Sequence, residues 1–194
     1  MKLNYLFSAL LHIAAITPFL FLFIDFFTRN LTAEPVQESM HRTGRYTLIL
    51  LLITLSCTPL KMITGQIYFS KLRKIFGLYS FFYAFIHFTI FTVVDYGLDL
   101  EFLKEAVLEK PYALAGLLAF ALLVPLALTS NRASMKYLKK NWKRLHSLIY
   151  ISTAAGIIHY FWLVKSDYRL PALYAAVFFI LMLFRAVPLI KKNK

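Results

Sequence analysis

The sequence has a single cysteine, Cys57, which lies inside an apolar run. One cysteine cannot form an internal disulfide, and without a Cys-x-x-Cys-His motif a covalently attached c-type haem is excluded. The G-x-G-x-x-G, P-loop and His-Glu-x-x-His motifs are also missing. The sequence therefore carries no signal for a nicotinamide cofactor, a phosphate-binding loop or a zinc site.

Charged residues are scarce as well. Only 16% of the 194 residues are Asp, Glu, Lys or Arg, whereas 60% are hydrophobic, and the mean hydropathy is +0.65. A soluble domain would be about half apolar and about one-quarter charged. Because long apolar runs recur along the whole length, we expect an all-α integral membrane bundle, with residues 1–194 forming a single transmembrane domain.

Six apolar segments are long enough to cross a bilayer, which requires about 20 helical residues with a tolerated range of about 17–25. The first is too long for the core of a signal peptide, so we expect it to be retained. The second and fourth are at the short end of the range. We identify no internal repeat and no long linker. The expected segments are roughly 5–26, 45–60, 75–94, 112–128, 145–164 and 170–189.

The basic residues predict the orientation of these segments. Most lysines and arginines fall in segments on the same side as the N-terminus, and the loop between the third and fourth segments is acidic. By the positive-inside rule, both termini are expected in the cytoplasm. This bias also explains the net charge of +13. We therefore expect a lipid membrane as partner and no nucleic acid, since no basic face is free to meet it.

Two histidines, His87 and His159, lie deep inside the third and fifth segments. Titratable groups are costly in a bilayer and usually face a cofactor, a partner or a water path. His87 follows Lys74 by 13 residues and His159 follows Arg144 by 15, so both lie about 20 Å from the inner charged boundary. Two imidazoles at matching depth can bind one haem iron from opposite sides. The alternative is that each is a neutral packing residue bonded to a nearby Tyr or Ser.

A third histidine, His146, precedes His159 by 13 residues and lies about 20 Å closer to the cytoplasm. That depth suits a second haem. However, the two histidines point about 140° apart around the helix, and the third segment offers Arg73 at this depth instead of a histidine. His146 and Arg73 are also suited to haem propionates, a flavin phosphate or a lipid head group. His41, before the second segment, is expected to be structural.

Short motifs in a fixed order run through nearly the whole chain. They resemble the family of haem-binding membrane subunits of the bacterial periplasmic methionine sulfoxide reductase system, MsrQ, within the ferric-reductase-like transmembrane superfamily. Each motif is weak alone, but the ordered set is specific. The motifs are Leu11-His12 with Pro18-Phe19-Leu20, His41-Arg-Thr-Gly-Arg45, Thr58-Pro-Leu60, Arg73-Lys-Ile-Phe-Gly-Leu78 leading to His87, Lys110-Pro-Tyr112, Leu126-Ala-Leu-Thr-Ser130, Trp142-Lys-Arg-Leu-His146 and His159-Tyr-Phe-Trp162 with Lys165.

The resemblance implies a six-helix protein of the bacterial inner membrane that binds haem b, with FMN as a further cofactor. It also implies a periplasmic molybdopterin methionine sulfoxide reductase as the partner that repairs oxidised proteins. The donor would be the quinone pool or a cytoplasmic flavin reductase. His87, His146 and His159 match the family's haem-associated histidines, and Arg73 matches an arginine of the inner site. No residue is assigned a catalytic role, because the chain would act as a non-catalytic electron-transfer subunit.

Three alternatives remain at the level of sequence. A transmembrane ferric-reductase-type electron carrier would use a different acceptor and a separate nicotinamide-binding protein. A proton transporter would use the histidines as a relay, but it would need more carboxylates within the membrane than Asp25 and Asp95, which lie at segment ends. A scaffold without a cofactor would use the histidines only for packing.

Overall fold

The computed structural model describes residues 5–192, and their side chains as far as Arg185. Every regular element in this part of the chain is a helix. In chain order these are α1 (Tyr5–Phe27), α2 (Pro35–Thr64), α3 (Phe69–Thr89) continued by a π-helix η1 (Ile90–Asp95), α4 (Leu100–Glu109), α5 (Pro111–Leu128), α6 (Arg132–Leu138), α7 (Lys140–His146), α8 (Leu148–Leu163) and α9 (Arg169–Lys192).

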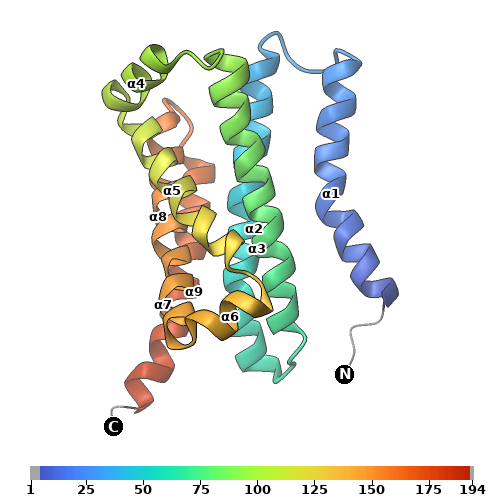
Figure 1. The fold of residues 1–194 in the computed structure, drawn as a ribbon, viewed down its shortest axis with the longest axis vertical. Helices are drawn as coiled ribbons and strands as arrows, with labels where there is room; N and C mark the ends of the chain where they lie inside the picture. The colour runs from blue at the N-terminus through green and yellow to red at the C-terminus, as the bar shows by residue number, and fades with distance from the viewer. Residues whose placement is uncertain (1–4, 193–194) are drawn as a thin grey trace.

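The helices form a bundle built from two tightly packed pairs, α2 with α3 and α5 with α8 (Figure 1). Helix α9 packs against α2 and α8, and α1 lies at the outside against α2 and α3. The short helix α4 covers one end of the bundle, called here the α4 end. At the opposite end, the terminal end, lie α6, α7, the start of α1 and the end of α9 (Figure 1).

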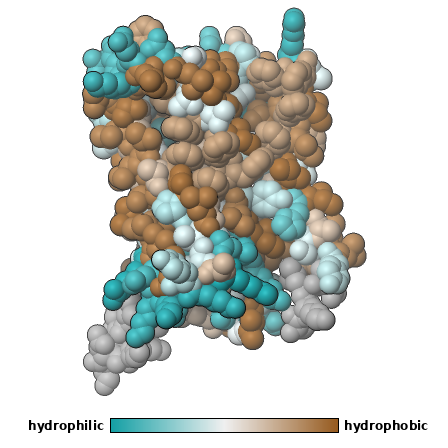
Figure 2. Space-filling model, viewed as in Figure 1, coloured by the Kyte–Doolittle hydropathy of each residue, from teal (hydrophilic) through white to brown (hydrophobic). Residues whose placement is uncertain are grey.

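The surface of the bundle has the distribution expected of a membrane protein. Figure 2 shows an apolar band between hydrophilic ends. Within the described residues, four helices are long and apolar enough to cross a bilayer, namely α1, α2, α3 with η1, and α5. Helix α8 has 16 residues but follows α7 through Ser147, whose backbone is helical, and α9 has 24. The protein is thus an all-helical membrane protein, and the six spans remain a prediction.

The prediction that the second segment is short was wrong. Helix α2 has 30 residues and begins at Pro35, ten residues before the expected start. The charged stretch near its start can be helical because Arg42 is neutralised: its guanidinium bonds Asp25 of α1 at 2.6 Å and Glu38 of α2 at 2.5 Å. The third segment is also longer than expected, from Phe69 to the end of η1 at Asp95.

Beside two prolines inside helices, side chains from other helices bond backbone groups. Beside Pro18 of α1, the fully buried hydroxyl of Tyr83 donates to the Ala15 carbonyl at 2.7 Å and accepts from the Phe19 N–H at 3.1 Å. Proline at a helix interior frees the carbonyl four residues earlier. Pro59 frees the Leu55 carbonyl in this way, and the guanidinium of Arg185 in α9 donates to it at 2.8 Å. These two sets of contacts attach the outer helices α1 and α9 to the central pairs of helices.

Candidate cofactor site

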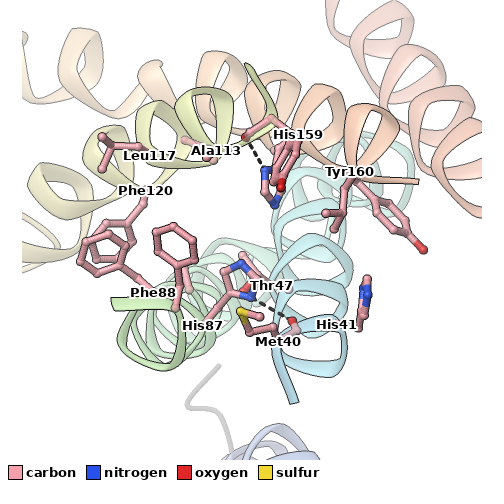
Figure 3. A pocket seen from close by; sticks show the side chains of 18 of the residues that line it. Met40, His41, Thr47, His87, Phe88, Ala113, Leu117, Phe120, His159 and Tyr160 are labelled. Atoms are coloured by element: carbon pink, nitrogen blue, oxygen red, sulfur yellow. Dashed lines mark hydrogen bonds between the residues drawn. The ribbon is translucent and has the colours of Figure 1, made fainter. Parts of the chain in front are cut away.

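A cavity of about 520 Å³ lies between the two helix pairs, towards the α4 end. Cofactor sites commonly measure about 300–1,000 Å³ and are largely apolar. Leu48 and Leu51 of α2 line this cavity, and so do Phe88 of α3 and Phe120 of α5, whose rings stack 4.5 Å apart. Figure 3 shows His87 and His159 in the same cavity. The cavity can therefore enclose a mainly apolar, flat cofactor.

His87 enters the cavity from α3 and is held by α2. Its Nδ1 lies 2.9 Å from the Met40 carbonyl oxygen and 3.3 Å from the Thr43 hydroxyl. Gly44 lies directly against the imidazole, since a Cβ at this position would be 3.2 Å from Cε1 of His87. A backbone carbonyl can only accept a hydrogen bond, so it selects the tautomer that carries the proton on Nδ1.

His159 is held in the same way by the other pair of helices. Its Nδ1 lies 2.6 Å from the carbonyl oxygen of Tyr112 at the start of α5. Gly116, one turn further along α5, is even closer to the ring than Gly44 is to His87. A Cβ on Gly116 would lie 2.8 Å from Nδ1 of His159. In both histidines the proton on Nδ1 leaves Nε2 as a lone-pair donor.

The spacing of the two imidazoles fits one metal bound between them. Their ring centroids are 6.1 Å apart and their planes are 84° from parallel. Two imidazoles that bind one metal through Nε2 have centroids about 6 Å apart, because each metal–nitrogen bond is about 2 Å and each nitrogen lies about 1 Å from its centroid. The structure thus brings together the two histidines that the sequence singled out.

The two halves of the site share one local arrangement, which the sequence alone did not reveal as an internal repeat. The bonds from His87 to Met40 and from His159 to Tyr112 each join residues 47 positions apart. In each half, a glycine follows the carbonyl residue by four positions. Positions in α2 and α3 therefore correspond to positions in α5 and α8 that lie 72 residues later in the sequence, as His159 follows His87 by 72 residues.

A second pair of hydrogen bonds obeys the same offset. The buried hydroxyl of Ser80 donates to the Thr47 carbonyl at 3.1 Å, and that of Ser152 donates to the Ala119 carbonyl at 2.8 Å. Both bonds span 33 residues. Since α2 and α5 start at the same end of the bundle (Figure 1), the halves are parallel repeats, as in membrane proteins whose repeat axis lies along the bilayer normal.

The other two candidate residues lie outside the cavity, at the terminal end. His146 closes α7, where its ring stacks on Trp142 at 3.9 Å. Its Nδ1 lies 3.1 Å from the Trp142 carbonyl oxygen, and its Nε2 lies 3.4 Å from the Ser130 hydroxyl. Arg73 is exposed near the start of α3. Neither residue shares a site with His87 and His159.

Polar residues line the cavity besides the histidines. His41, which was expected from the sequence to be structural, lines the cavity together with Arg45, and both residues belong to α2. The opposite wall has Lys110, whose ammonium donates to the Tyr96 hydroxyl at 3.1 Å. That hydrogen bond, followed by nearby tyrosines and Asp95, raises the pKa of Lys110. Lys110 is therefore a cation at this wall.

The donor set fits haem better than a bare metal ion. In the part of the chain that the structure describes, no three His, Cys, Asp or Glu residues are grouped to hold a metal. A haem iron needs only two axial donors from the protein, because the porphyrin supplies the remaining nitrogens. Sequence reasoning found both histidines but missed Gly44 and Gly116. The sequence feature that could have identified these glycines is their equal spacing, since each lies 43 residues before one of the two histidines.

Comparisons with known proteins identify the family. The model of the ferric reductase like transmembrane component family matches residues 43–157, a range that contains Gly44, His87 and Gly116 and ends two residues before His159. No solved structure matches. Among curated proteins, the protein-methionine-sulfoxide reductase heme-binding subunit MsrQ of Xanthomonas axonopodis pv. citri is 43% identical over 184 residues, covering 92% of this chain and 84% of the relative. MsrQ of Herminiimonas arsenicoxydans is 37% identical over 183 residues, covering 93% and 84%. The chain therefore belongs to the MsrQ heme-binding subunits, within the ferric-reductase-like transmembrane family.

Proposed function

We propose that this protein is a haem b-binding electron-transfer subunit in which His87 and His159 are the axial ligands of one haem. The observation that carries the proposal is the matched pair of imidazoles, 6.1 Å apart, each with Nδ1 bound to a backbone carbonyl. A haem held there would supply reversible one-electron chemistry. The two carbonyls fix the imidazole tautomers, and the stacked rings of Phe88 and Phe120 give the cavity an apolar wall.

The proposed direction of electron flow rests on the names of the relatives and on the position of the cavity. We propose that electrons come from the quinone pool or a cytoplasmic flavin reductase and pass to a periplasmic molybdopterin methionine sulfoxide reductase. Two observations support this. The relatives are named as heme-binding subunits of a protein-methionine-sulfoxide reductase. The cavity lies towards the α4 end, opposite the termini that the basic residues assign to the cytoplasm of an inner-membrane protein.

A second cofactor is proposed at the terminal end, with His146 and Arg73 as binding residues. His146 donates from Nδ1 to the Trp142 carbonyl, which leaves Nε2 as its ligand atom, as in the two cavity histidines. The family resemblance suggests an inner haem or FMN. FMN released from purified protein by acid can be quantified by its fluorescence, and His146→Ala is expected to lower either the FMN or part of the haem.

The visible spectrum of the purified protein tests the main proposal. We expect a low-spin b-type spectrum with a sharp α band on reduction, and a colourless preparation would contradict it. His87→Ala and His159→Ala should each abolish the same haem signal. The matched control is His12→Ala, because His12 lies in α1, bonds Tyr79 at 3.1 Å and is outside the cavity. If either cavity variant keeps the wild-type spectrum, that histidine is not a ligand.

The acceptor is tested with the same preparation. Reduced protein should be reoxidised by methionine sulfoxide only when the periplasmic reductase is added. Reoxidation at the same rate without the reductase would favour a different acceptor, such as ferric iron.

A further inference from the structure

Arg45 is a cation against the cavity that lacks an anionic partner. It lines the cavity and forms no hydrogen bond or ion pair with any residue that the structure describes. Arg42, three residues earlier in α2, has two carboxylate partners, Asp25 and Glu38. An arginine within a membrane helix is costly and usually has a counter-ion. Arg45 is therefore suited to an anionic group that enters the cavity.

The helix geometry directs Arg45 to the level of the two imidazoles. Gly44, the preceding residue, packs on the His87 ring. Side chains of a helix lean towards its N-terminus, which for α2 is the α4 end. Its guanidinium is near enough to interact electrostatically with His41 of α2 and with Tyr174 of α9. An anion bound there would lie beside the cofactor and on the α4-end side of it.

The acidic residues that line the cavity form no ion pair with Arg45. Asp95 lies on the opposite wall, where it interacts with Lys110. Glu34 also lines the cavity, but as the N-cap of α2 it precedes Arg45 by eleven residues, about 16 Å along the helix. A carboxylate beside Arg45 would therefore have to come from the bound ligand.

The internal correspondence shows that the arginine is specific to one half of the site, since the cation of the other half, Lys110, lies at the start of α5 beside Tyr96 and Asp95. With the offset of 72 residues, Arg45 corresponds to Leu117 and His41 corresponds to Ala113. Both of these apolar residues line the same cavity (Figure 3). The two halves thus match in their histidines and glycines but differ in where their cations lie, because Asp95 faces Lys110 and no carboxylate in the described part of the chain pairs with Arg45. A cofactor with carboxylates on one edge would bind such a cavity in one orientation.

We propose that Arg45 binds a propionate carboxylate of the haem and so fixes which edge of the macrocycle faces α2. This rests on the proposed function, since it requires haem b between His87 and His159. The guanidinium donates charge-assisted hydrogen bonds to the carboxylate, and Leu117 on the symmetry-related wall offers none. Arg45 acts as a positioning residue and is not an axial ligand.

The experiment compares two porphyrins in apoprotein purified from haem-limited cells, wild type and Arg45→Gln. One is iron protoporphyrin IX and the other is its dimethyl ester, in which both carboxylates are blocked. We expect Arg45→Gln to weaken binding of the free acid about tenfold or more, as for a hydrogen bond to a charged group. The dimethyl ester should bind both proteins alike. Lys104→Gln removes the same charge from an exposed site on α4, outside the cavity, and should change neither affinity.

Two further measurements separate positioning from folding. Arg45→Lys should recover part of the lost affinity, because the charge is kept while the planar fork is lost. In Arg45→Gln that retains haem, the midpoint potential should fall, because a cation near haem favours the reduced form. The proposal is overturned if Arg45→Gln binds the free acid as wild type does, or if it loses the ester and the free acid equally. If wild type binds neither porphyrin, the proposed function itself fails.

Discussion

At the scale of single residues, the site depends on backbone carbonyls and glycines as much as on histidines. The Met40 and Tyr112 carbonyls orient the imidazoles, and Gly44 and Gly116 leave room for them. The histidines were predictable from sequence because a titratable side chain in an apolar run is costly. The carbonyls were not predictable, because a backbone oxygen has no signature in the identity of its residue.

Gly116→Ala should reduce haem binding without unfolding the protein. The added Cβ would lie 2.8 Å from Nδ1 of His159, so the ring must move away from the Tyr112 carbonyl. Loss of such an orienting partner typically costs about tenfold or more in metal affinity. The ratio of haem to protein after purification measures the effect.

Gly77→Ala is the matched control for this substitution. Its Cβ would meet Thr54 at 3.6 Å, an ordinary contact. A Gly116→Ala protein with the wild-type haem ratio and spectrum would show that His159 does not need this space.

At the scale of helices, hydropathy predicted which segments exist but misplaced their ends. Helix α5 was located within one residue, because Pro111 starts it and few charges obscure its apolar run. The start of α2 was missed because the sequence shows Glu38 and Arg42 as charges, whereas the structure pairs them with each other and Arg42 also with Asp25. The helices α4 and α6 at the bundle ends have no spanning signal at all.

Helix α1 is attached to the bundle by few groups, so Tyr83→Phe should loosen it. Tyr83 is fully buried, and its hydroxyl contacts both the Ala15 carbonyl and the Phe19 N–H beside Pro18. Removing the hydroxyl should lower the free energy of unfolding by about 1 kcal/mol, since the freed groups can bond each other in part. Thermal unfolding in detergent measures this.

The control is Tyr79→Phe, which removes an exposed hydrogen bond between the same two helices, to His12 at 3.1 Å. This substitution should change stability little. Equal effects of the two substitutions would mean that the contact at Pro18 has no special role in holding α1.

At the scale of the whole molecule, the ends of the bundle differ in charge and in content. The terminal end has the basic helices α6 and α7, whereas the α4 end has the cavity and an acidic short helix. Helix α2, with 30 residues, is about 45 Å long, against a hydrocarbon core of about 30 Å. It therefore extends beyond the core, and its charged first turns reach the polar head groups.

Fusions to reporter proteins test this arrangement. A fluorescent protein after Lys194 should fluoresce, because it folds in the cytoplasm, and alkaline phosphatase there should be inactive. Phosphatase inserted after Glu109 in α4 should be active. An insertion at Gly65, in the turn between α2 and α3 at the terminal end, should behave as the fusion at Lys194 does. If Glu109 and Lys194 report the same side, the two ends do not lie on opposite faces of the membrane.

The correspondence between the two halves of the cavity is also relevant to the evolution of the site. A single hairpin such as α2–α3 holds one histidine, one glycine and one carbonyl, which is half of a two-ligand site. Two copies of that hairpin that face each other across an axis would provide both ligands of the site. A short ancestral gene whose product formed a dimer would therefore encode the complete two-ligand site. A duplication that joined two such copies into one chain would leave each free to diverge where metal binding does not require symmetry. Arg45 opposite Leu117 is such a place.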